Sequence, residues 1–471
     1  MSKSLSVKSI IEPARETKVC YEVDVVVVGG GPGGIGAAVC AARAGADTVL
    51  IERYGHLGGM ASGGLVNIIP NLSDIYGKQH IAGIVQEIID RMDTRGAVSC
   101  PKKPDWGSSE KKIVDLYLNA NLRHFFVREN YKLGKEIVLY SALVDPEVLK
   151  DELNDMVKEA GVKLYLHSWG TQPLMEGNQV KGVIFESKSG RQAVLGKVVI
   201  DSTGDGDLLI PAGASVITEI KRPSRIANLA FCFWITNVDN KKEDEFRASQ
   251  PEKYGDLMKE LAAKRGFPGH FRGLLKDQEN VIWFHPHIPA GDQTDVEEMT
   301  KVDVDTRKRA LITWEFLKKY VTGYEKSYIM QTAPQLGTTG GRRVVGEYIL
   351  TEKDMNTDIP FEDTIAVFAG NDRGELSHQY PKMYIPYRSL VPKKVEGLLV
   401  ACRAFSSEDS VNNHFNLIPH CFCFGQAAGT AAAMALSSGV SVRDVNIKAL
   451  QENLLKQGVI LPDKISTKKS V

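Results

Sequence analysis

The stretch VDVVVVGGGPGGIGAA, residues 23–38, decides how the first part of this chain folds. Its valine run is typical of a parallel strand that is buried on both faces. The glycine-rich turn then leads into small residues that are typical of a tightly packed helix. A second apolar run follows at Thr48–Ile51. These segments together predict a βαβ unit at the start of a parallel sheet.

The turn carries the spacing GxGxxG at Gly29, Gly31 and Gly34. In this pattern the first glycine permits a tight turn, the second lets the backbone approach a pyrophosphate, and the third lets helix and strand pack closely. Glu52 ends the second strand, where a carboxylate accepts hydrogen bonds from both hydroxyls of an adenosine ribose. Because a carboxylate repels a 2'-phosphate, we expect FAD or NAD here and not NADP.

A second glycine cluster, YGHLGGMASGG at residues 54–64, follows the ribose-binding acid directly. It supplies flexible backbone where a tricyclic ring and its phosphates need close approach, which favours FAD over NAD. No second GxGxxG lies between a strand and a helix, which argues against a dedicated NAD(P)H domain. We therefore expect electrons to enter or leave through the substrate, oxygen or a separate carrier protein.

Two later blocks repeat the strand, loop and helix pattern. One has an amphipathic helix from Asp145 to Ala160, a strand KLYLH, an antiparallel excursion from Gly170 to Gly196, and KVVIDSTGDGD. The other runs from GLLVACRAF to GQAAGTAAAMAL. The predicted fold is α/β: a Rossmann-like FAD-binding domain with a parallel central sheet, plus an inserted α+β substrate or cap domain. Its predicted parts are residues 20–64, 141–214 and 397–463 for the FAD-binding domain, 65–140 and 215–396 for the insert, and 1–19 for a surface arm.

Composition excludes several classes of protein. The 58 basic and 58 acidic side chains cancel, which gives no electrostatic reason to expect nucleic acid or an anionic membrane as a partner. Seven scattered cysteines form no disulfide framework, and the first 20 residues lack the apolar core of a signal peptide, so we expect a cytoplasmic protein. The run from Cys421 to Leu436 contains glycines and Gln426, which favours a buried helix over a membrane span. The composition is compatible with a homo-oligomer.

Several motifs, in order from about Glu12 to Leu461, resemble the FAD-dependent oxidoreductase family. They are EPARETKVCYEVDVVVVGGGPGGIGAA, LIERYGHLGGMASGGLV, VDPEVLKDELNDMVKEAGVKLYLHS, VVIDSTGDGDLLIPAGA, GRRVVGEYILTEKD and GQAAGTAAA. The resemblance implies the two-dinucleotide-binding-motif flavoprotein fold, similar in plan to the fumarate reductase and succinate dehydrogenase flavoproteins.

The same resemblance implies which residues bind the cofactor. The pyrophosphate would be held by Gly29, Gly31, Pro32, Gly33 and Gly34, and the adenosine ribose by Glu52. The diphosphate and ribityl chain would be lined by Arg53, Gly58, Gly59 and Met60. A loop near the cofactor would be formed by Thr203, Gly204 and Asp205. Gly425, with Ala427 and Ala428, would begin a helix aimed at the flavin. A helix N-terminus there stabilises the negative charge of reduced flavin near N1 and O2.

The chain also departs from the family pattern, in the region that would contact a substrate. Arg342 and Arg343 follow Thr339, Gly340 and Gly341 in place of an Arg-Glu-Thr triplet. Between the third strand and the last helix, where the family places His and Arg, stand Asp409, Asn412 and Asn416. The resemblance therefore predicts FAD far better than it predicts a substrate.

Candidate catalytic groups follow from what flavin chemistry needs, an acid or base and an oxygen-binding cation. His420 and His414 lie just before the expected flavin-facing helix; the alternative for each is a hydrogen-bonded structural histidine. Arg342 and Arg343 are candidates for binding a substrate oxygen, or else they bridge domains through carboxylates such as Glu347. In YIPYRSL, Tyr384, Tyr387 and Arg388 match a family motif, and Tyr384 is a candidate proton donor or a core aromatic residue.

Three further patterns are weaker. His56 lies one residue out of register with the position where some related flavoproteins attach FAD covalently. His285 and His287 alternate on a predicted strand, but without a third ligand they make a poor metal site, and we expect no metal. Cys421 and Cys423 form a CxC pair that is either a thiol relay or, more in keeping with a buried helix, packing residues.

We expect an enzyme that moves a hydride between flavin N5 and a small organic substrate, by alcohol or C–H dehydrogenation or by reduction of an activated double bond. One alternative is an FAD-carrying electron-transfer subunit without a substrate pocket of its own. Another is a non-redox enzyme similar to thiazole synthases, in which the dinucleotide is substrate or scaffold.

Overall fold

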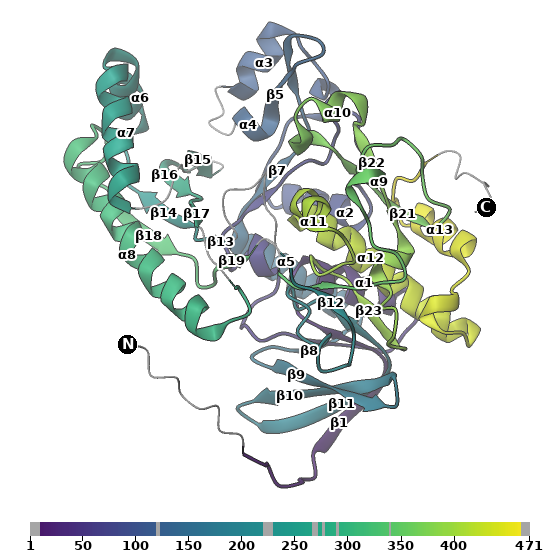
Figure 1. Cartoon of the computed structure of the whole chain (residues 1–471). Helices are drawn as coiled ribbons and strands as arrows, with labels where there is room; N and C mark the ends of the chain where they lie inside the picture. The colour runs from purple at the N-terminus through teal and green to yellow at the C-terminus, as the bar shows by residue number, and fades with distance from the viewer. Residues whose placement is uncertain are drawn as a thin grey trace.

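A computed structural model describes residues 10–118, 123–219, 229–265, 272–275, 278–288, 292–338 and 341–462. Its largest sheet has the strand order β8-β2-β1-β11-β10-β9, with β23 also paired to β11 (Figure 1). These strands are β1 (Lys18–Val28), β2 (Thr48–Ile51), β8 (Lys163–Tyr165), β9 (Trp169–Glu176), β10 (Gln179–Ser187), β11 (Gly190–Asp201) and β23 (Leu398–Val400). The five strands β1, β2, β8, β11 and β23 pair in parallel, whereas β9 and β10 extend β11 as an antiparallel ribbon.

The valine run forms the middle of this sheet, as the sequence predicts. Val25 to Val28 pair with β2 on one side and β11 on the other, and all four side chains are buried. The strand begins earlier than expected, at Lys18, and so includes the last two residues of the predicted surface arm, 1–19. Lys18 and Val19 continue the ladder along Gln192 and Ala193, which gives their backbone groups partners. Residues 1–9 lie outside the described part of the chain.

Three helices contact strands of this sheet: α1 (Pro32–Arg43), α5 (Pro146–Glu159) and α12 (Ile418–Ser438). Two more, α2 (Ile84–Thr94) and α13 (Ile447–Lys456), pack against α12. Helix α5 has the predicted extent; Asp145 caps it, and Pro146 occupies its first turn. Helix α12 begins at Ile418, not at Gly425 as the sequence suggested. Pro419 stands in the first turn, where proline's fixed φ suits a helix and its missing N–H removes no bond.

Helices α1 and α12 approach each other closely through glycines. A Cβ at Gly425 would overlap the carbonyl oxygen of Gly33, and a Cβ at Gly429 would overlap that of Ala37. The two helices therefore run in the same direction with backbone against backbone, and their N-termini lie at the same end of the pair. This corrects the expected place of Gly425, Ala427 and Ala428: they lie beyond the first two turns of α12, in its buried part.

Residues 65–144 and 215–415 supply the remaining elements. Above the sheet lie β3 (Ile68–Ile69), β4 (Val98–Ser99), α3 (Lys111–Leu118), α4 (Arg123–Phe126), β5 (Val127–Asn130), β6 (Lys135–Val138), β7 (Ala142–Val144), β12 (Val216–Ile217), β20 (Arg343–Val344), α9 (Glu352–Met355), β21 (Thr364–Ala369), α10 (Leu376–Gln379), β22 (Lys382–Pro386) and α11 (Asp409–Phe415).

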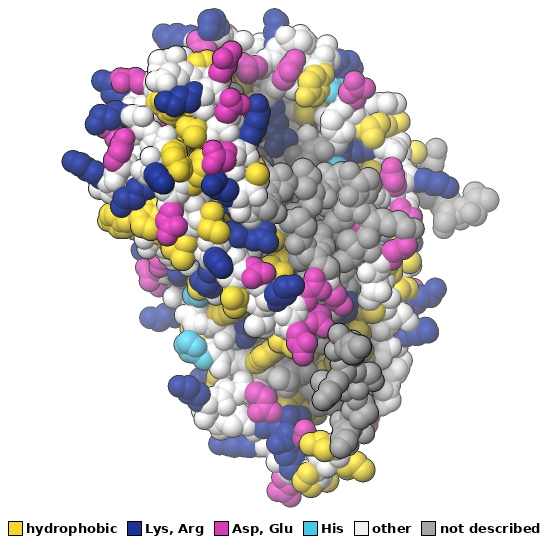
Figure 2. Space-filling view, turned by 60° about the vertical axis from the view of Figure 1, so that its left-hand side comes forward, with side chains coloured by type: hydrophobic (Ala, Val, Ile, Leu, Met, Phe, Trp, Pro, Cys, Tyr) yellow, Lys and Arg dark blue, Asp and Glu magenta, His cyan; other side chains and the backbone are white. Residues whose placement is uncertain are grey.

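A helical arm projects from one side of the molecule in Figure 1. It consists of β13 (Leu229–Ala230), β14 (Phe233–Thr236), α6 (Asn240–Ser249), α7 (Pro251–Arg265), β15 (Arg272–Leu275), β16 (Gln278–Phe284), β17 (His287–Ile288), α8 (Val296–Tyr320), β18 (Tyr328–Thr332) and β19 (Gly337–Thr338). The arm has its own core, in which Phe233 and Phe284 stack at 5.0 Å. On the face that carries it, basic, acidic and apolar side chains are interspersed (Figure 2).

The hydrophobic core crosses the predicted domain boundaries. The same buried cluster that contains α1, α5 and α12 also takes in Ile84 to Met92 of α2 and Ile365 to Leu390. Both segments belong to the region predicted as an insert. The boundaries themselves stay a prediction, but these parts pack as one unit with the dinucleotide-binding sheet.

Among the helices of the described residues, none has the length and apolar character needed to cross a membrane. The run from Cys421 to Leu436, the one segment that raised the question, is a largely buried part of α12.

Gly425→Ala should destabilise the protein by about 1–3 kcal/mol, because the new methyl group forces α1 and α12 apart. Gly255→Ala is the matched control: this glycine lies in α7 with open space around its Cα, so alanine should be neutral or stabilise by up to about 1 kcal/mol. Urea unfolding measures both changes. Equal stability of the two variants would contradict close helix packing at Gly425.

Candidate active site

Four parallel strands end at one edge of the sheet, and the residues that follow them line a groove of about 640 Å³. Gly29 follows β1, Glu52 follows β2, Ser202 follows β11, and Cys402 comes shortly after β23. Loops at the carboxyl ends of parallel strands are the usual ligand site of open α/β sheets. The fold therefore brings together segments that are as much as 370 residues apart in the chain.

The turn after β1 has the backbone that the GxGxxG pattern predicts. Gly29 has φ of +98°, and a Cβ there would overlap the carbonyl of Ser202. A Cβ at Gly34 would overlap the carbonyl of Gly29, whereas the open side of Gly31 meets nothing within 4 Å. The amides at the start of α1 thus stand beside a glycine with free space, which suits a bound pyrophosphate.

Glu52 lies 5% exposed at the side of this groove. Its Oε2 accepts a hydrogen bond from the Gly30 amide at 2.5 Å, and Oε1 accepts one from the Tyr54 amide at 2.7 Å. Burial raises the pKa of this carboxyl, and the two amides oppose that shift. The amides fix the carboxylate in one orientation at the groove, as a ribose-binding acid requires.

Arg53, expected along the diphosphate and ribityl chain, lines the groove beside Tyr54. Its guanidinium lies 4.8 Å from the ring centre of Tyr54 and 5.9 Å from that of Trp169. Trp169 also lines the groove and is 55% exposed. This end of the groove therefore presents an aromatic and cationic surface next to Glu52.

The loop after β11 is held by a buried carboxylate. Asp201 accepts hydrogen bonds from the Thr203 amide and hydroxyl and from the Leu208 amide, at 3.0, 2.7 and 3.0 Å. Burial, together with the charge of Asp207, raises the pKa of Asp201 to about 6. Asp201 thus fixes the conformation of the predicted loop, which is rich in Gly and Asp, through hydrogen bonds to Thr203 and Leu208.

Two arginines face this loop inside the groove. Arg403 donates to Asp205 Oδ2 at 2.7 Å, and Arg342 lies 3.9 Å from Asp207. Several buried polar atoms of the groove have no hydrogen-bond partner among the described residues: Nε of Arg342, Nε of Arg403, Oδ1 of Asp205 and Oε1 of Gln335. Buried polar groups are nearly always bonded, so a polar ligand that satisfies them fits this groove.

Most of the predicted cofactor residues meet here. Gly29, Gly31, Pro32, Gly33, Glu52, Arg53, Gly59, Met60, Thr203, Gly204 and Asp205 line the groove, whereas Gly34, Gly58, Gly425, Ala427 and Ala428 do not. The N-terminal part of α12 that reaches the groove is Cys421, one turn after the helix begins. The predicted helix N-terminus is thus present, but other residues form it.

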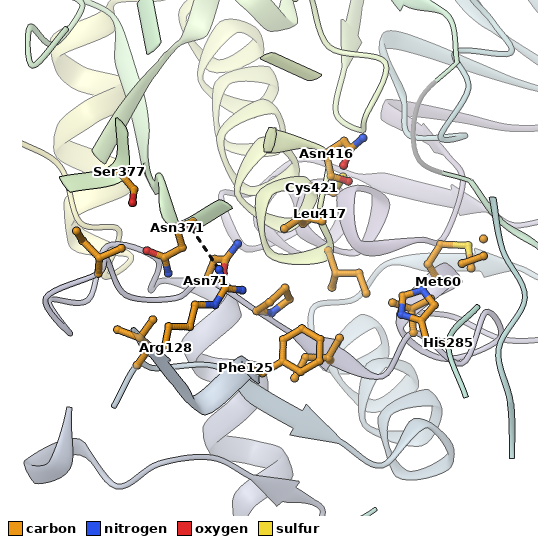
Figure 3. A pocket seen from close by; sticks show the side chains of 18 of the residues that line it. Met60, Asn71, Phe125, Arg128, His285, Asn371, Ser377, Asn416, Leu417 and Cys421 are labelled. Atoms are coloured by element: carbon orange, nitrogen blue, oxygen red, sulfur yellow. Dashed lines mark hydrogen bonds between the residues drawn. The ribbon is translucent and has the colours of Figure 1, made fainter. Parts of the chain in front are cut away.

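A second cavity of about 730 Å³ adjoins the groove (Figure 3). Both cavities are lined by Pro32, Met60, Arg403 and Cys421, so they meet at these residues. The second cavity is mostly apolar, with a few polar side chains that include Asn71, Arg128, His285, Asn371, His378 and Asn416. Its volume is in the usual range for sites that bind small organic molecules.

His420, the first catalytic candidate, lines neither cavity. It is 0% exposed, its Nδ1 accepts a hydrogen bond from the Leu417 amide at 3.3 Å, and its ring stacks 4.2 Å from Phe368. The structure therefore favours the structural alternative for His420: it caps the first turn of α12 from inside the core.

The other catalytic candidates, apart from Arg342, also lie away from both cavities. Their contacts are structural: Arg343 donates to Ser407 O and Asp409, Arg388 forms a bidentate pair with Asp363, the Tyr384 hydroxyl donates to Asp358 at 2.8 Å, Tyr387 donates to Val442 O, and His414 lies beside Phe415 on α11. Arg343 and Arg388 are thus occupied by carboxylates or carbonyls. Thr339 and Gly340 lie outside the described residues.

The weaker patterns have separate outcomes. His56 stacks on Tyr54 at 5.5 Å and lines neither cavity. Cys423 packs in the core, whereas Cys421 faces both cavities, and burial raises the pKa of each thiol to about 12. His285 follows β16 rather than lying within a strand, and the side chain of His287 is outside the description. Within the described residues, no group of three or more His, Cys, Asp or Glu side chains is placed to hold a metal.

The residues that sequence reasoning missed have different signals. Arg403 directly follows the strand GLLVA and its cysteine, so the rule of strand ends would have found it. Asn71, Arg128 and Asn371 lie in segments without a motif. Only the tertiary structure, which places β5, the loop after β3 and the turn before α10 around one space, brings them to one cavity.

A parallel sheet with a phosphate turn, a buried ribose-side acid and an adjoining apolar cavity defines a dinucleotide-dependent oxidoreductase. The chain belongs to the FAD dependent oxidoreductase family, whose profile matches residues 24–454. It is therefore an enzyme, and its cofactor is FAD. A comparison with curated proteins found no match.

Several solved structures are similar to this chain. They include a geranylgeranyl bacteriochlorophyll reductase-like protein from Thermoplasma acidophilum (14% identity, 93% of this chain and 84% of that chain, TM-score 0.42), p-nitrophenol 4-monooxygenase from Pseudomonas putida (10%, 93% and 85%, 0.47) and L-amino acid deaminase from Proteus myxofaciens (13%, 94% and 96%, 0.42).

Glu52→Gln should weaken FAD binding about tenfold or more, because a neutral amide with one acceptor oxygen cannot replace a charged acceptor of two ribose hydrogen bonds. The flavin absorbance per protein that survives dialysis measures the loss. Glu22→Gln, at an exposed position of β1, is the control and should retain its flavin. Full flavin content in Glu52→Gln would remove Glu52 from the site.

Asp201 should make the protein less stable as the pH rises from about 4 to about 6. Its pKa is about 6 in the folded protein and 3.8 ordinarily, so the folded state holds this proton more tightly than the unfolded chain, and the free energy of unfolding falls through that window. Urea unfolding of the wild type and Asp201→Asn at several pH values measures the difference. A stability difference that does not change with pH would contradict a raised pKa.

Proposed function

We propose that this enzyme transfers a hydride between FAD in the groove and a small organic substrate in the second cavity. The observation that carries this proposal is that the two cavities meet at Pro32, Met60, Arg403 and Cys421. A substrate in the second cavity would thus stand against whatever part of the cofactor reaches that junction. The substrate carbon is either dehydrogenated or, in the reverse sense, an activated double bond is reduced.

FAD, when bound, supplies a two-electron centre at N5. We propose that the start of α1 holds the diphosphate, that Glu52 holds the adenosine ribose, and that Thr203, Gly204 and Asp205 lie along the remainder. The first turn of α12 faces the junction, and its free amides stabilise negative charge there. Arg403 adds a partly buried positive charge next to the same point.

The side chains of the second cavity would exclude water from the reacting carbon. Met60, Leu417 and Cys421 supply apolar surface beside the junction. His285 lines the same cavity, on the side where Figure 3 shows Met60. An imidazole titrates near neutral pH, so we propose that His285, rather than His420, gives or takes the accompanying proton.

The second cavity disfavours an electron-transfer subunit without a substrate pocket, because about 730 Å³ of mostly apolar space has no role there. FAD as the cofactor disfavours the non-redox alternative. After dehydrogenation, oxygen or a separate carrier protein would reoxidise the flavin; after reduction of a double bond, a separate carrier protein would supply the electrons. The proposal is compatible with a homo-oligomer.

Anaerobic mixing of the yellow protein with a panel of alcohols and saturated carbonyl compounds tests the proposal. At least one compound should bleach the flavin, or an activated alkene should restore the colour of the reduced protein. His285→Ala should keep its FAD but slow that step about a hundredfold or more. His414→Ala, which alters a histidine outside both cavities, is the control. Bleaching that requires a partner protein would overturn the proposal.

A further inference from the structure

The second cavity has two chemically different ends (Figure 3). Met60, His285 and Cys421 lie toward the cofactor groove. Asn371 and Arg128 lie toward the other end, with apolar side chains such as Phe125 between the two ends. A molecule that fills the cavity would therefore have one end at the junction and the other beside Asn371.

The Asn371 side chain leaves an acceptor without a partner. Its Nδ2 donates to the carbonyl of Ser73 at 2.8 Å, and this bond fixes which way the amide faces. The residue is only 8% exposed, and its Oδ1 is buried without a hydrogen-bond partner among the described residues. A buried carbonyl of this kind needs a donor, and here the cavity lies next to it.

Arg128 places donors beside the same residue. Its Nη1 donates to the backbone carbonyl of Asn371 at 3.3 Å, so the guanidinium lies against Asn371 and also lines the cavity. A guanidinium carries five N–H donors in a fixed plane and accepts nothing. This end therefore offers an acceptor, Asn371 Oδ1, and a donor, Arg128.

Side chains of both signs, Arg128 and Glu129, line this end of the cavity. Glu129 lines the cavity and is itself exposed to solvent. The pKa of His378 is lowered mainly by burial; Lys132 lowers it further, and Glu375 opposes the shift. An anion would meet Glu129, and a cation would meet Arg128. A neutral group that both donates and accepts, a hydroxyl, suits this end better than either ion.

We propose that the second cavity recognises an apolar molecule through a neutral hydroxyl group at the end remote from the flavin. Asn371 Oδ1 accepts a hydrogen bond from the hydroxyl group, and Arg128 donates a hydrogen bond to the hydroxyl oxygen. The hydroxyl is an anchor and not the reacting group, and the carbon at the opposite end of the molecule stands at the junction. This assignment of a substrate class rests on the proposed function for its reacting end.

Calorimetric titration of the FAD-loaded protein with 4-butylphenol, 4-butylanisole and butylbenzene tests the anchor without any turnover. The phenol should bind about 10- to 100-fold more tightly than the anisole, since the methyl ether cannot donate to Asn371. In Asn371→Ala this ratio should fall to about threefold or less, because the acceptor is gone.

Asn67→Ala is the matched control. Asn67 is also buried, donates to a backbone carbonyl at 3.0 Å and has an Oδ1 without a partner among the described residues, but it lines neither cavity. It should lose stability as Asn371→Ala does and keep the preference for the phenol.

Equal affinity of the wild type for the phenol and the anisole would overturn the inference, even if Asn371→Ala fails to fold. So would an unchanged preference in Asn371→Ala. Phenol-selective binding without bleaching by any compound would leave the anchor intact and defeat the proposed hydride transfer. Bleaching by compounds that bind without a preference for a hydroxyl group would support the proposed hydride transfer and defeat the anchor.

Discussion

The contact between α1 and α12 is the constraint on which the rest of the structure depends. Gly33, Gly425 and Gly429 let the two backbones touch, and side chains at these positions would separate them. Because the helices run in the same direction, their N-termini come to one place, the junction of the two cavities. Two positive helix ends at one point favour a cofactor that carries a diphosphate and gains negative charge on reduction.

Behind that junction, the buried carboxylates set the shape of the cofactor groove. Asp201 holds the loop after β11 through three hydrogen bonds, and Asp205 pairs with Arg403 across the groove. A buried charge is stable only with partners, and several polar atoms of this groove still lack one among the described residues. The protein thus provides a groove whose polar surface is completed by a ligand.

Two histidines show what a sequence pattern can predict about the place of a residue and what it cannot. His420 lies five residues before a glycine-rich stretch, which suggested a place at the flavin. In the fold that stretch is the middle of α12, so His420 falls in the first turn and faces Phe368. His285, in a segment whose spacing suggested a weak metal pair, faces the cavity instead. Spacing fixes a residue's place along an element, but not the start of that element.

The sequence by itself determined the βαβ unit, the phosphate turn, Glu52 and the cofactor, because these depend on short stretches whose backbone conformations only certain residues allow. Even the parallel sheet follows from its valine runs. Tertiary structure alone decided which residues begin α12, and that Asn71, Arg128 and Asn371 share one cavity. Those residues come from distant segments, and contacts across such distances depend on the packing of whole elements, which no local pattern records.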